Sequence, residues 1–471
     1  MDLEAPAHEI ARLVSAGSVS AEEVIERTLE RMRDTERLNI FISTNPDAVS
    51  EARRIDGMVR DGSDPGRLAG VPVSIKDNIC TRAMPTTCAS RMLEGYVSPY
   101  EATVVERLRR EGAIIVGKTN LDEFAMGLTT EFSAYGPTLN PRDPRYVPGG
   151  SSGGSAASVA AGAAAISLGS DTGGSVRNPA SFCGVAGFKP TYGMVSRYGL
   201  VSYANSIEQV GPLARTIPDI VLAMQAISGP DPRDGTTAGA RPVSDTEDIV
   251  DGKRIGIVRQ MAPDSLHPGV RTVFERAVSG LESLGAACEE VSLEMVDYSV
   301  AAYYTITSTE AGSNLARYDN IRYGYGLERE GYEFHRYVAA SRDRFGPEVK
   351  RRIIAGGFVP SAGYAGRYFL KALKVKSRLT REVNRLFGTY DYLVSPTVPV
   401  PPFRLGEMLD DPVELFQLDI NTVAANLAGK PAVSVPCGTC DGLPVGVQLI
   451  ADSFRDGPLL GAARALEGVV Q

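Results

Sequence analysis

Apolar residues recur at helical spacing through the first part of the chain. Residues 7–35 contain two such stretches that break near Gly17, which predicts two helices rather than one. The second stretch follows Ser20, and Glu23 lies three residues later, the spacing of a capping box at a helix start. A further amphipathic helix is predicted over about residues 46–60. The chain is therefore expected to open with helices.

The next part of the chain alternates short apolar runs with helices. Residues 70–75 predict a buried strand. A helix over about 101–111 leads into a second strand at 113–116, and another helix is expected from Asn120. Alternation of this kind is typical of an α/β fold. We expect a large mixed, mostly parallel central β-sheet that helices cover on both faces.

Residues 151–165 consist almost entirely of small residues. Fourteen of the fifteen are Gly, Ala or Ser, and Val159 is the exception. A flexible linker is one interpretation, but alanine favours a helix and the segment carries no charge. Residues typical of a strand follow at Ile166 and Leu168. Because a helix with so little bulk lets other backbones approach closely, we expect it to be buried at the centre of the fold.

The second half of the chain follows a Pro- and Gly-rich stretch, residues 228–252, which predicts a long surface connection. Strands are predicted at 254–258, 287–291, 392–394, 432–435 and 445–450, and helices at 270–284, 412–428 and the C-terminus. We expect a single domain over 1–471, with N-terminal helices at 1–65, a core at 66–227, a helical insertion at about 297–388 and an α/β return at 389–471.

Composition and charge narrow the class of protein. The 471 residues include 49 Lys and Arg against 57 Asp and Glu, so the chain lacks the basic excess of a protein that grips nucleic acid unaided. Six scattered cysteines do not form a disulfide framework. No signal peptide is visible, and the most apolar stretch, residues 156–168, is too short to span a bilayer. We expect a cytoplasmic protein without a membrane contact.

Two short motifs match patterns whose chemistry their context does not support. Residues 112–119 fit the phosphate-loop pattern GxxxxGK[ST], but a charged helix precedes them and their middle residues predict a strand. Cys437 and Cys440 form a single CxxC, and structural zinc would need two further ligands at suitable spacing. We therefore interpret the first motif as a strand and the second as turn cysteines without a metal or redox role.

Histidine is scarce, which restricts the hydrolytic chemistry available. The chain holds three histidines in unrelated contexts, His8, His267 and His335, and no GxSxG nucleophile elbow. Surface or packing roles are expected for all three. Lys76 offers another base, because it ends a predicted strand where α/β sheets usually carry their chemistry. A solvated surface cation is the alternative interpretation of this lysine.

Two glycine-rich turns add serines and backbone donors. Residues 149–155, GGSSGGS, open the alanine-rich helix, and residues 170–177, SDTGGSVR, precede another helix at about Ser175. Backbone N–H groups in such turns either bind an anion or face a developing oxyanion. Together with Lys76, the two turns supply nucleophiles, a base and N–H donors without histidine. Generic anion binding is the alternative.

This constellation resembles the signature of the amidase signature family. The likeness covers residues 147–193, VPGGSSGGSAASVAAGAAAISLGSDTGGSVRNPASFCGVAGFKPTYG. Supporting segments are KDNI at 76–79, TTCAS at 86–90, DEFAMG at 122–127, NLARYDNIRYGY at 314–325 and GLPVGVQLI at 442–450. The resemblance spans essentially the whole chain and implies a single amidase domain with the amidase-signature fold.

The resemblance implies a Ser-cisSer-Lys triad. Ser175 would be the nucleophile, Ser151 the bridging serine with a cis peptide bond, and Lys76 the base. Lysine accepts a proton only when it is neutral, so its pKa must fall from about 10.4 toward neutrality through burial or a nearby dipole. The backbone N–H groups of the oxyanion hole are expected at Thr172, Gly173 and Gly174.

The resemblance also implies a binding site for the amino-acid part of glutamine. A free amino acid needs a cation for its carboxylate and an anion for its ammonium group. These roles fall to Arg352 and Asp419, with Tyr304 lining the pocket. Arg351 and Tyr303 are adjacent alternatives.

Within the family, the likeness is strongest to the glutaminase subunits of tRNA-dependent amidotransferases. The resemblance implies that this chain hydrolyses the glutamine side-chain amide through a γ-glutamyl ester and passes ammonia to a partner. It implies a heterotrimer with the B and C subunits of such an enzyme, in which ATP and Mg are used by the partner, mischarged tRNA contacts mainly the B partner, and this chain holds no cofactor. The product, Gln-tRNA(Gln) or Asn-tRNA(Asn), stays open.

Two other classes share these residues. A stand-alone amidase that acts on a small or aryl amide would use the same triad. A catalytically idle scaffold is disfavoured because Lys76, Ser151 and Ser175 are all present. The segments DEFAMG and NLARYDNIRYGY favour the amidotransferase subunit over the stand-alone amidase.

Overall fold

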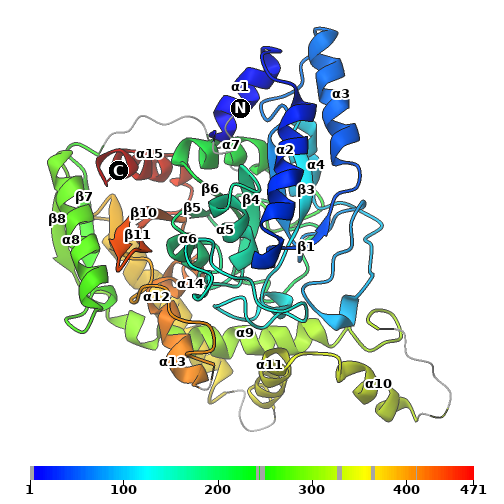
Figure 1. Ribbon diagram of the computed structural model, residues 1–471. Helices are drawn as coiled ribbons and strands as arrows, with labels where there is room; N and C mark the ends of the chain where they lie inside the picture. The colour runs from blue at the N-terminus through cyan, green and yellow to red at the C-terminus, as the bar shows by residue number, and fades with distance from the viewer. Residues whose placement is uncertain are drawn as a thin grey trace.

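The computed structural model describes residues 5–239, 243, 250–325, 331, 333–361, 366–409 and 411–470. In this part of the chain eleven strands form one sheet, in the order β1-β3-β2-β4-β6-β5-β10-β11-β9-β7-β8. Helices lie against both faces of the sheet (Figure 1). The predicted fold class, an α/β fold with a large mixed sheet between helices, is confirmed.

The strands are short, and the central ones are buried. Their bounds are β1 Phe41–Thr44, β2 Pro72–Lys76, β3 Ile114–Thr119, β4 Ile166–Asp171, β5 Ala186–Lys189, β6 Gln209–Ala214, β7 Arg254–Val258, β8 Ala287–Val291, β9 Tyr392–Pro396, β10 Ala432–Cys440 and β11 Leu443–Ala451. Every residue of β2, β3, β4 and β6 is buried, as expected for strands covered on both faces.

The helices occupy most of the predicted ranges. Their bounds are α1 Ala7–Ser15, α2 Ala21–Asp34, α3 Ala48–Arg60, α4 Thr103–Arg110, α5 Gly153–Ala160, α6 Arg177–Cys183, α7 Ile217–Ile227, α8 Pro268–Ser283, α9 Ser299–Leu315, α10 Phe334–Arg342, α11 Pro347–Phe358, α12 Phe369–Leu386, α13 Pro412–Gln417, α14 Val423–Leu427 and α15 Asp456–Val470. The predicted buried central helix is α5, in which all residues but the last are buried.

Most neighbouring strands run antiparallel, which corrects the prediction of a mostly parallel sheet. Four pairs are parallel, β2 with β3 and β4, and β7 with β8 and β9, whereas six are antiparallel. The sequence pattern did not predict β5 and β6, which account for three antiparallel pairs. Strands β10 and β11 form a hairpin around Asp441 and Gly442, whose φ angles of 51° and 79° suit a two-residue turn.

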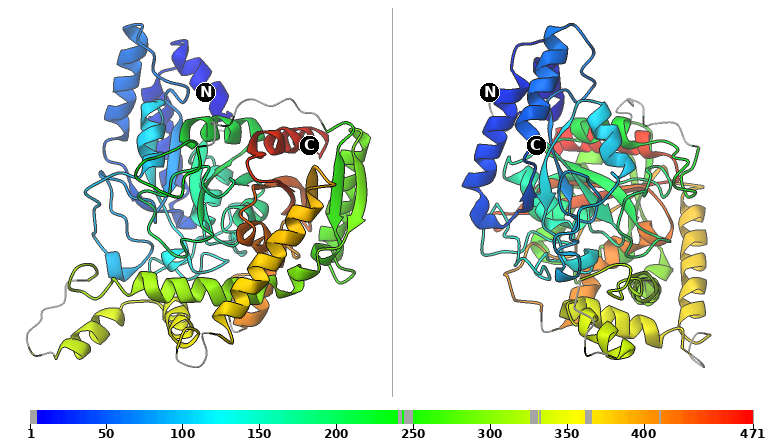
Figure 2. Two further views of the ribbon diagram at one scale, coloured as in Figure 1. Left: turned by 180° about the vertical axis from the view of Figure 1, so that it is seen from behind. Right: turned by 90° about the vertical axis from the view of Figure 1, so that its right-hand side faces the viewer.

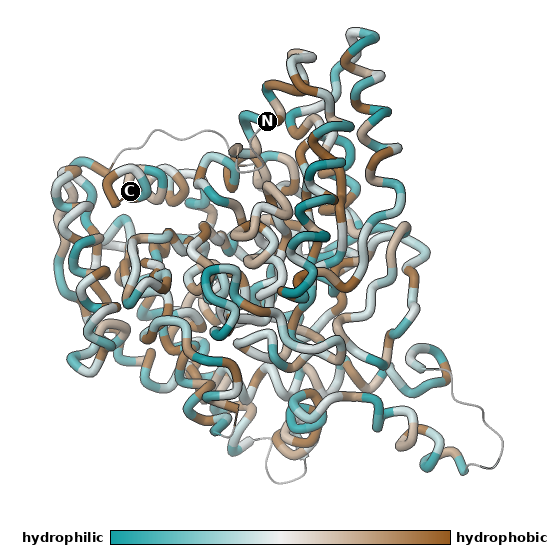
Figure 3. The backbone as a smooth tube through the Cα atoms, in the orientation of Figure 1, coloured by the Kyte–Doolittle hydropathy of each residue, from teal (hydrophilic) through white to brown (hydrophobic). Residues whose placement is uncertain are grey.

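Helices α7, α8 and α15 cover one face of the sheet, and α5 and α6 cover the other. In β10, Val433 and Val435 join the apolar core under the first group. Ser434 between them lies beside Gly446 on the face where Ser181 of α6 packs. The alternation follows from the two-residue period of a strand. Figure 3 shows that the outer helices α2 and α3 carry both apolar and polar residues, as expected for helices with one buried side.

Helices α2 and α3 pack beside β3, whereas α1 packs against α3 and α7 (Figure 2). Ser20 caps α2 as predicted, because its Oγ accepts the N–H of Glu23 at 3.4 Å. The second half of the predicted capping box is replaced by Asp56 of α3, which accepts the N–H groups of Ala21 at 2.6 Å and Glu22 at 3.0 Å. The start of α2 is therefore stabilised by a neighbouring helix.

Residues 120–132 form an irregular loop, which corrects the prediction of a helix from Asn120. A single 3-10 turn, Glu123–Ala125, is the helical part of this loop. The Asp122 carboxylate accepts the backbone N–H of Thr130 at 2.9 Å. A side chain that bonds nearby backbone groups in this way competes with helix formation.

The helix predicted at 412–428 is divided. Its middle is a 3-10 turn, Leu418–Asn421, between α13 and α14. The Asn421 side chain donates to Pro396 O at 2.9 Å, and Thr422 Oγ1 donates to Gly173 O at 2.6 Å. These tertiary hydrogen bonds hold the segment in a tighter turn than a continuous α-helix allows.

The predicted surface connection at 228–252 is anchored at its start. Asp231 is buried and accepts hydrogen bonds from Thr103 and, at 2.7 Å, from Ser196. Positions 240–242 and 244–249 of this connection lie outside the described residues.

The predicted helical region consists of α9 to α12. Helices α11 and α12 pack against α9, and this group shares an apolar core with Leu393 and Ile450 of the sheet. Helix α10 extends away from the body of the molecule (Figures 1 and 2). These helices therefore pack beside the sheet and share part of its apolar core.

Most of the phosphate-loop match at 112–119 and both cysteines of the CxxC pair lie in strands. The middle of the phosphate-loop match is β3, as predicted, so no loop surrounds a phosphate there. Cys437 and Cys440 lie within β10, which corrects their assignment to a turn. Burial raises the pKa of the Cys437 thiol to about 12.

The three histidines lie in or next to three different helices of the fold. His8 Nδ1 lies 2.8 Å from Asp219 Oδ1, His267 Nδ1 accepts the N–H of Gly269 at the start of α8, and His335 is exposed on α10. In the described part of the chain, no helix combines the length and apolar character that crossing a bilayer requires.

Candidate active site

Lys76 is the last residue of β2 and is fully buried between β3 and β4. Its Nζ donates hydrogen bonds to Ser151 Oγ at 2.8 Å and Ser170 Oγ at 2.9 Å. Burial lowers the pKa of the amine to about 7, although the carboxylates of Asp122 and Asp171 act to raise it. A lysine with this pKa can accept a proton near neutral pH.

Ser151 lies in the glycine-rich turn before α5, and its peptide bond with Gly150 is cis. The turn depends on residues without side chains. A Cβ on Gly150 would lie 2.2 Å from Asp122 Oδ2, and Gly149 has a φ of 78°. The sequence therefore permits the close approach that places Ser151 beside Lys76.

Ser175 lies in the second glycine-rich turn, between β4 and α6. Its carbonyl oxygen accepts the N–H of Ser152 at 3.2 Å, which joins the two turns. Within the described residues, no hydrogen bond links Ser175 Oγ directly to Ser151 Oγ. Ser175 is 8% exposed whereas Lys76 and Ser151 are 0% exposed, so a substrate can reach Ser175 alone among the three. Catalytic hydrogen bonds often tighten only when substrate binds.

The predicted oxyanion donors differ in availability. The N–H of Gly174 donates to Asp171 Oδ1 at 2.9 Å, which corrects its assignment as a free donor. None of the hydrogen bonds among the described residues uses the N–H of Thr172 or Gly173. The turn therefore offers two of the three expected N–H groups to a developing negative charge.

A buried ion pair that sequence reasoning missed holds this turn in place. Arg177 Nη2 lies 3.0 Å from Asp171 Oδ1, and both side chains are fully buried. Burial acts to raise the pKa of Asp171, but the charge and hydrogen bonds of Arg177 outweigh it and hold the pKa at about 2. The arginine two residues after Ser175 was the one available signal in the sequence.

Sequence reasoning also missed Ser170. Its Oγ accepts hydrogen bonds from Lys76 Nζ and from Asn78 Nδ2, each at 2.9 Å. It precedes the last residue of β4, next to β2 in the sheet, so the topology alone brings it beside Lys76.

The predicted glutamine-binding residues come together. Tyr304 of α9 donates its hydroxyl to Asp419 Oδ2 at 2.8 Å. The Arg352 guanidinium of α11 lies 4.9 Å from the centre of the Tyr304 ring. Burial raises the pKa of Asp419 to about 7, against the hydrogen bond from Tyr304 and the charge of Arg352, which lower it. The cluster thus contains the Arg352 guanidinium, which Glu348 Oε1 contacts at 2.6 Å, and a second buried carboxyl group, that of Asp419.

The neighbouring residues take different positions. Arg351 is 38% exposed at its side chain, whereas that of Arg352 is 4% exposed. Tyr303 packs against Gly173, where an added Cβ would lie 2.4 Å from the tyrosine Cζ. Arg352 is therefore the arginine buried in the cluster, and Arg351 is not. Tyr303 contacts the second glycine-rich turn, whereas Tyr304 contacts Asp419.

Thr422 connects this cluster with the second glycine-rich turn. Its Oγ1 donates to Gly173 O at 2.6 Å and to Asp419 O at 3.1 Å. Asp419 therefore lies three residues before Thr422, which contacts the turn that carries Ser175. The two groups of predicted residues form one site.

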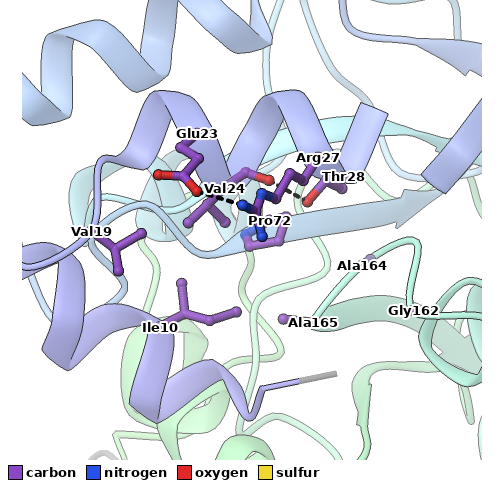
Figure 4. A pocket seen from close by; sticks show the side chains of 10 residues that line it. All are labelled: Ile10, Val19, Glu23, Val24, Arg27, Thr28, Pro72, Gly162, Ala164 and Ala165. Atoms are coloured by element: carbon purple, nitrogen blue, oxygen red, sulfur yellow. Dashed lines mark hydrogen bonds and ion pairs between the residues drawn. The ribbon is translucent and has the colours of Figure 1, made fainter. Parts of the chain in front are cut away.

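A small, mainly apolar pocket elsewhere carries no comparable chemistry. It lies between α1, α2 and the segment before β4, with the Glu23–Arg27 ion pair at its edge (Figure 4). Pro72 lines it at the start of β2, about 13 Å along the strand from Lys76. Among the described residues, no group of three His, Cys, Asp or Glu side chains is arranged to hold a metal ion.

The α/β fold with its mixed sheet places a buried lysine beside serines in two glycine-rich turns. Such an arrangement is typical of an enzyme that activates a serine as a nucleophile. The chain belongs to the amidase family, whose model matches residues 23–460.

The similarity to individual relatives covers nearly the whole chain. The chain is 56% identical over 461 residues to the A subunit of glutamyl-tRNA(Gln) amidotransferase from Cenarchaeum symbiosum. The match covers 98% of this chain and 96% of the relative. The A subunit from Symbiobacterium thermophilum is 49% identical over 471 residues, covering 99% and 96%. The crystal structure of the A subunit from Thermotoga maritima shares 42% identity, with a TM-score of 0.83 and coverage of 99% and 95%.

Proposed function

We propose that this chain is the glutaminase subunit of a tRNA-dependent amidotransferase. The observation that carries the proposal is the 2.8 Å hydrogen bond from Lys76 to Ser151 in a buried site beside Ser175. The relatives named above, which are A subunits of glutamyl-tRNA(Gln) amidotransferases, support the choice of reaction. In this proposal the whole chain forms one amidase domain that works in the cytoplasm.

The first half of the reaction forms a tetrahedral intermediate on Ser175. Neutral Lys76 accepts the proton of Ser151 while Ser151 accepts that of Ser175, and Ser175 Oγ attacks the carbonyl carbon of the glutamine side-chain amide. The N–H groups of Thr172 and Gly173 stabilise the resulting oxyanion. Removing one such donor costs about 3–4 kcal/mol in comparable sites.

The second half releases both products. The proton returns through Ser151 to the leaving nitrogen, so the C–N bond breaks, ammonia departs and a γ-glutamyl ester stays on Ser175. Water, deprotonated by the same Lys76–Ser151 relay, attacks the ester carbonyl. The ester bond breaks, glutamate leaves, and Ser175 regains its proton.

Glutamine is positioned by the charged cluster. Arg352 binds its α-carboxylate, and ionised Asp419 binds its α-ammonium group with Tyr304 beside it. A stand-alone amidase for an aryl amide is the alternative with the same triad. Arg352 is already paired with Glu348 at 2.6 Å, whereas Asp419 forms no ion pair among the described residues. The α-ammonium group of an amino acid would compensate the buried charge of Asp419, and the cluster therefore favours an amino acid.

The ammonia is consumed by partner subunits. In this proposal the B and C subunits complete a heterotrimer, ATP and Mg act in the partner, and Glu-tRNA(Gln), Asp-tRNA(Asn) or both bind mainly to the B partner. The net charge of −8 supports a chain that leaves most tRNA contacts to another subunit.

Co-purification followed by a glutaminase assay tests the proposal. We expect the tagged chain to recover two partner subunits and to release glutamate from glutamine, with higher activity when ATP and mischarged tRNA are added. Recovery of the chain alone, with rapid hydrolysis of aryl amides and none of glutamine, would contradict the proposal and support the stand-alone amidase.

A further inference from the structure

The irregular loop after β3 holds the turn that carries Ser151. The N–H of Asp122 donates to Ser151 O at 3.2 Å. Thr130 Oγ1 donates to Gly149 O at 2.8 Å and accepts the N–H of Gly153 at 3.0 Å. Backbone groups before, at and after the bridging serine are therefore fixed by this one loop.

The Asp122 carboxylate packs against the turn that carries Ser151 and is held there by hydrogen bonds. Its Oδ2 accepts the N–H of Thr130 at 2.9 Å, and its Oδ1 accepts that of Phe132 at 3.1 Å. A Cβ on Gly150 would lie 2.2 Å from Oδ2, so the carboxylate rests on the backbone of that glycine. Asp122 is fully buried. Its position is thus set by two hydrogen bonds and by packing.

The carboxylate acts on Lys76 through space. Lys76 Nζ gives its hydrogen bonds to Ser151 and Ser170, and it forms no direct ion pair with Asp122 among the described residues. Of the charges that raise the pKa of Lys76, that of Asp122 has the largest effect. The other titratable groups facing Lys76 are Asp171, Cys88 and Glu208, and Asp122 itself faces Lys76 and Glu131.

We propose that Asp122 is a positioning residue of the active site. Its backbone and carboxylate order the turn of Ser151, and its buried charge acts on the site without occupying a hydrogen bond of the Lys76 amine. This inference rests on the proposed function, because it assigns Lys76 the role of base. A direct ion pair would hold the proton on Lys76, whereas a carboxylate beyond contact moderates the effect of burial.

The rate at which a sulfonyl fluoride labels Ser175, measured against pH in the amidotransferase complex, tests this inference. The label reports the Lys76-dependent activation of Ser175 without glutamine turnover. Asp122→Asn removes the negative charge that favours protonated Lys76, so the acid limb of the profile should move to lower pH by about one unit. The maximal rate should fall about tenfold or more because the turn loosens.

Three variants separate the charge from the packing. Asp122→Glu keeps the charge and should leave the acid limb near its wild-type position. Glu123→Gln removes the adjacent buried carboxyl group, which bonds Ser90 and Gly346 but does not face Lys76, and should not move the limb. Asp122→Ser is also neutral and has a smaller side chain, so it replaces Asp122→Asn if the asparagine variant does not fold. Its acid limb should move to lower pH by about one unit as well.

The outcomes distinguish the two proposals. A slower rate with an unmoved acid limb in both neutral variants would reduce Asp122 to a structural residue and overturn this inference alone. Wild-type protein that is not labelled at Ser175, although folded and assembled, would overturn the proposed function and this inference with it. A limb that moves equally in Glu123→Gln would also contradict the assignment to Asp122.

Discussion

At the scale of single residues, the proposed base is a lysine rather than a histidine, and its surroundings set its pKa. Burial alone disfavours the charged amine, and the hydroxyl groups of Ser151 and Ser170 occupy its hydrogen-bonding positions. Asp122 and Asp171 oppose the effect of burial from beyond direct contact. The resulting pKa of about 7 lies where a general base works best at neutral pH.

Replacing Lys76 with arginine tests the base directly. Arginine keeps the positive charge but cannot give up its proton, so we expect Lys76→Arg to lower kcat about 10⁴-fold or more. In the wild-type protein kcat should rise with pH through about 7, because Lys76 is neutral above its pKa, and fall about tenfold per unit below it. Glutamine hydrolysis by both proteins, measured from about pH 5 to 9, gives the ratio of their kcat values and the pKa of the base. Turnover by Lys76→Arg close to that of wild type would refute the role of base.

Arg352 provides a test of substrate recognition. Lysine keeps the charge but cannot reproduce the planar guanidinium that contacts Tyr203, Tyr304 and Glu348. We expect Arg352→Lys to raise KM for glutamine about tenfold to a hundredfold with a smaller change in kcat. Arg351→Lys, at the half-exposed neighbouring position, is the matched control and should leave KM nearly unchanged. An equal effect at both positions would contradict the assignment.

At the scale of elements, the two glycine-rich turns allow the strands and helices to meet. The turn after β4 brings Gly173 against the Tyr303 ring, and its carbonyl oxygen accepts a hydrogen bond from Thr422. Two segments that are distant from this turn in the sequence, α9 and the segment at Thr422, therefore contact Gly173. The geometry of the oxyanion donors depends on that packing.

Adding a methyl group at Gly173 should disturb this packing. The new Cβ would lie 2.4 Å from Tyr303 Cζ, so the ring or the turn must move. We expect Gly173→Ala to lower kcat about a hundredfold, since displacements near 1 Å have effects of this size. Gly57→Ala on α3, where a Cβ meets nothing within 4 Å, is the control and should retain full activity. Wild-type kcat in Gly173→Ala would show that the turn is not sensitive to this contact.

Local sequence patterns predicted most elements because each has its own period or cap. They failed where a hydrogen bond from a side chain to the backbone decides the structure. The loop at 120–132 is not helical because Asp122 bonds the backbone of Thr130, and α2 is capped by Asp56 of another helix. Likewise, Gly174 could not be excluded as an oxyanion donor until Asp171 was seen to accept its N–H.

At the scale of the whole molecule, the sheet topology explains why the triad could be predicted and its surroundings could not. The motif at 147–193 contains Ser151 and Ser175 in two nearby turns, and β2 delivers Lys76 next to β4. Arg352 and Asp419 come from the helical layer and from the segment before β10, and their adjacency depends on how these layers pack. The antiparallel majority arises from β5, β6 and the β10–β11 hairpin, which alternation with helices does not reveal.

In the proposed reaction, Ser175 is the residue that carries the glutamine-derived acyl group. Mass spectrometry of the amidotransferase complex, quenched with acid during glutamine turnover, measures this most directly. We predict a γ-glutamyl adduct on the peptide that contains Ser175, and neither adduct nor glutamate release in Ser175→Ala. An adduct on another residue, or hydrolysis by Ser175→Ala at the wild-type rate, would contradict the proposed mechanism.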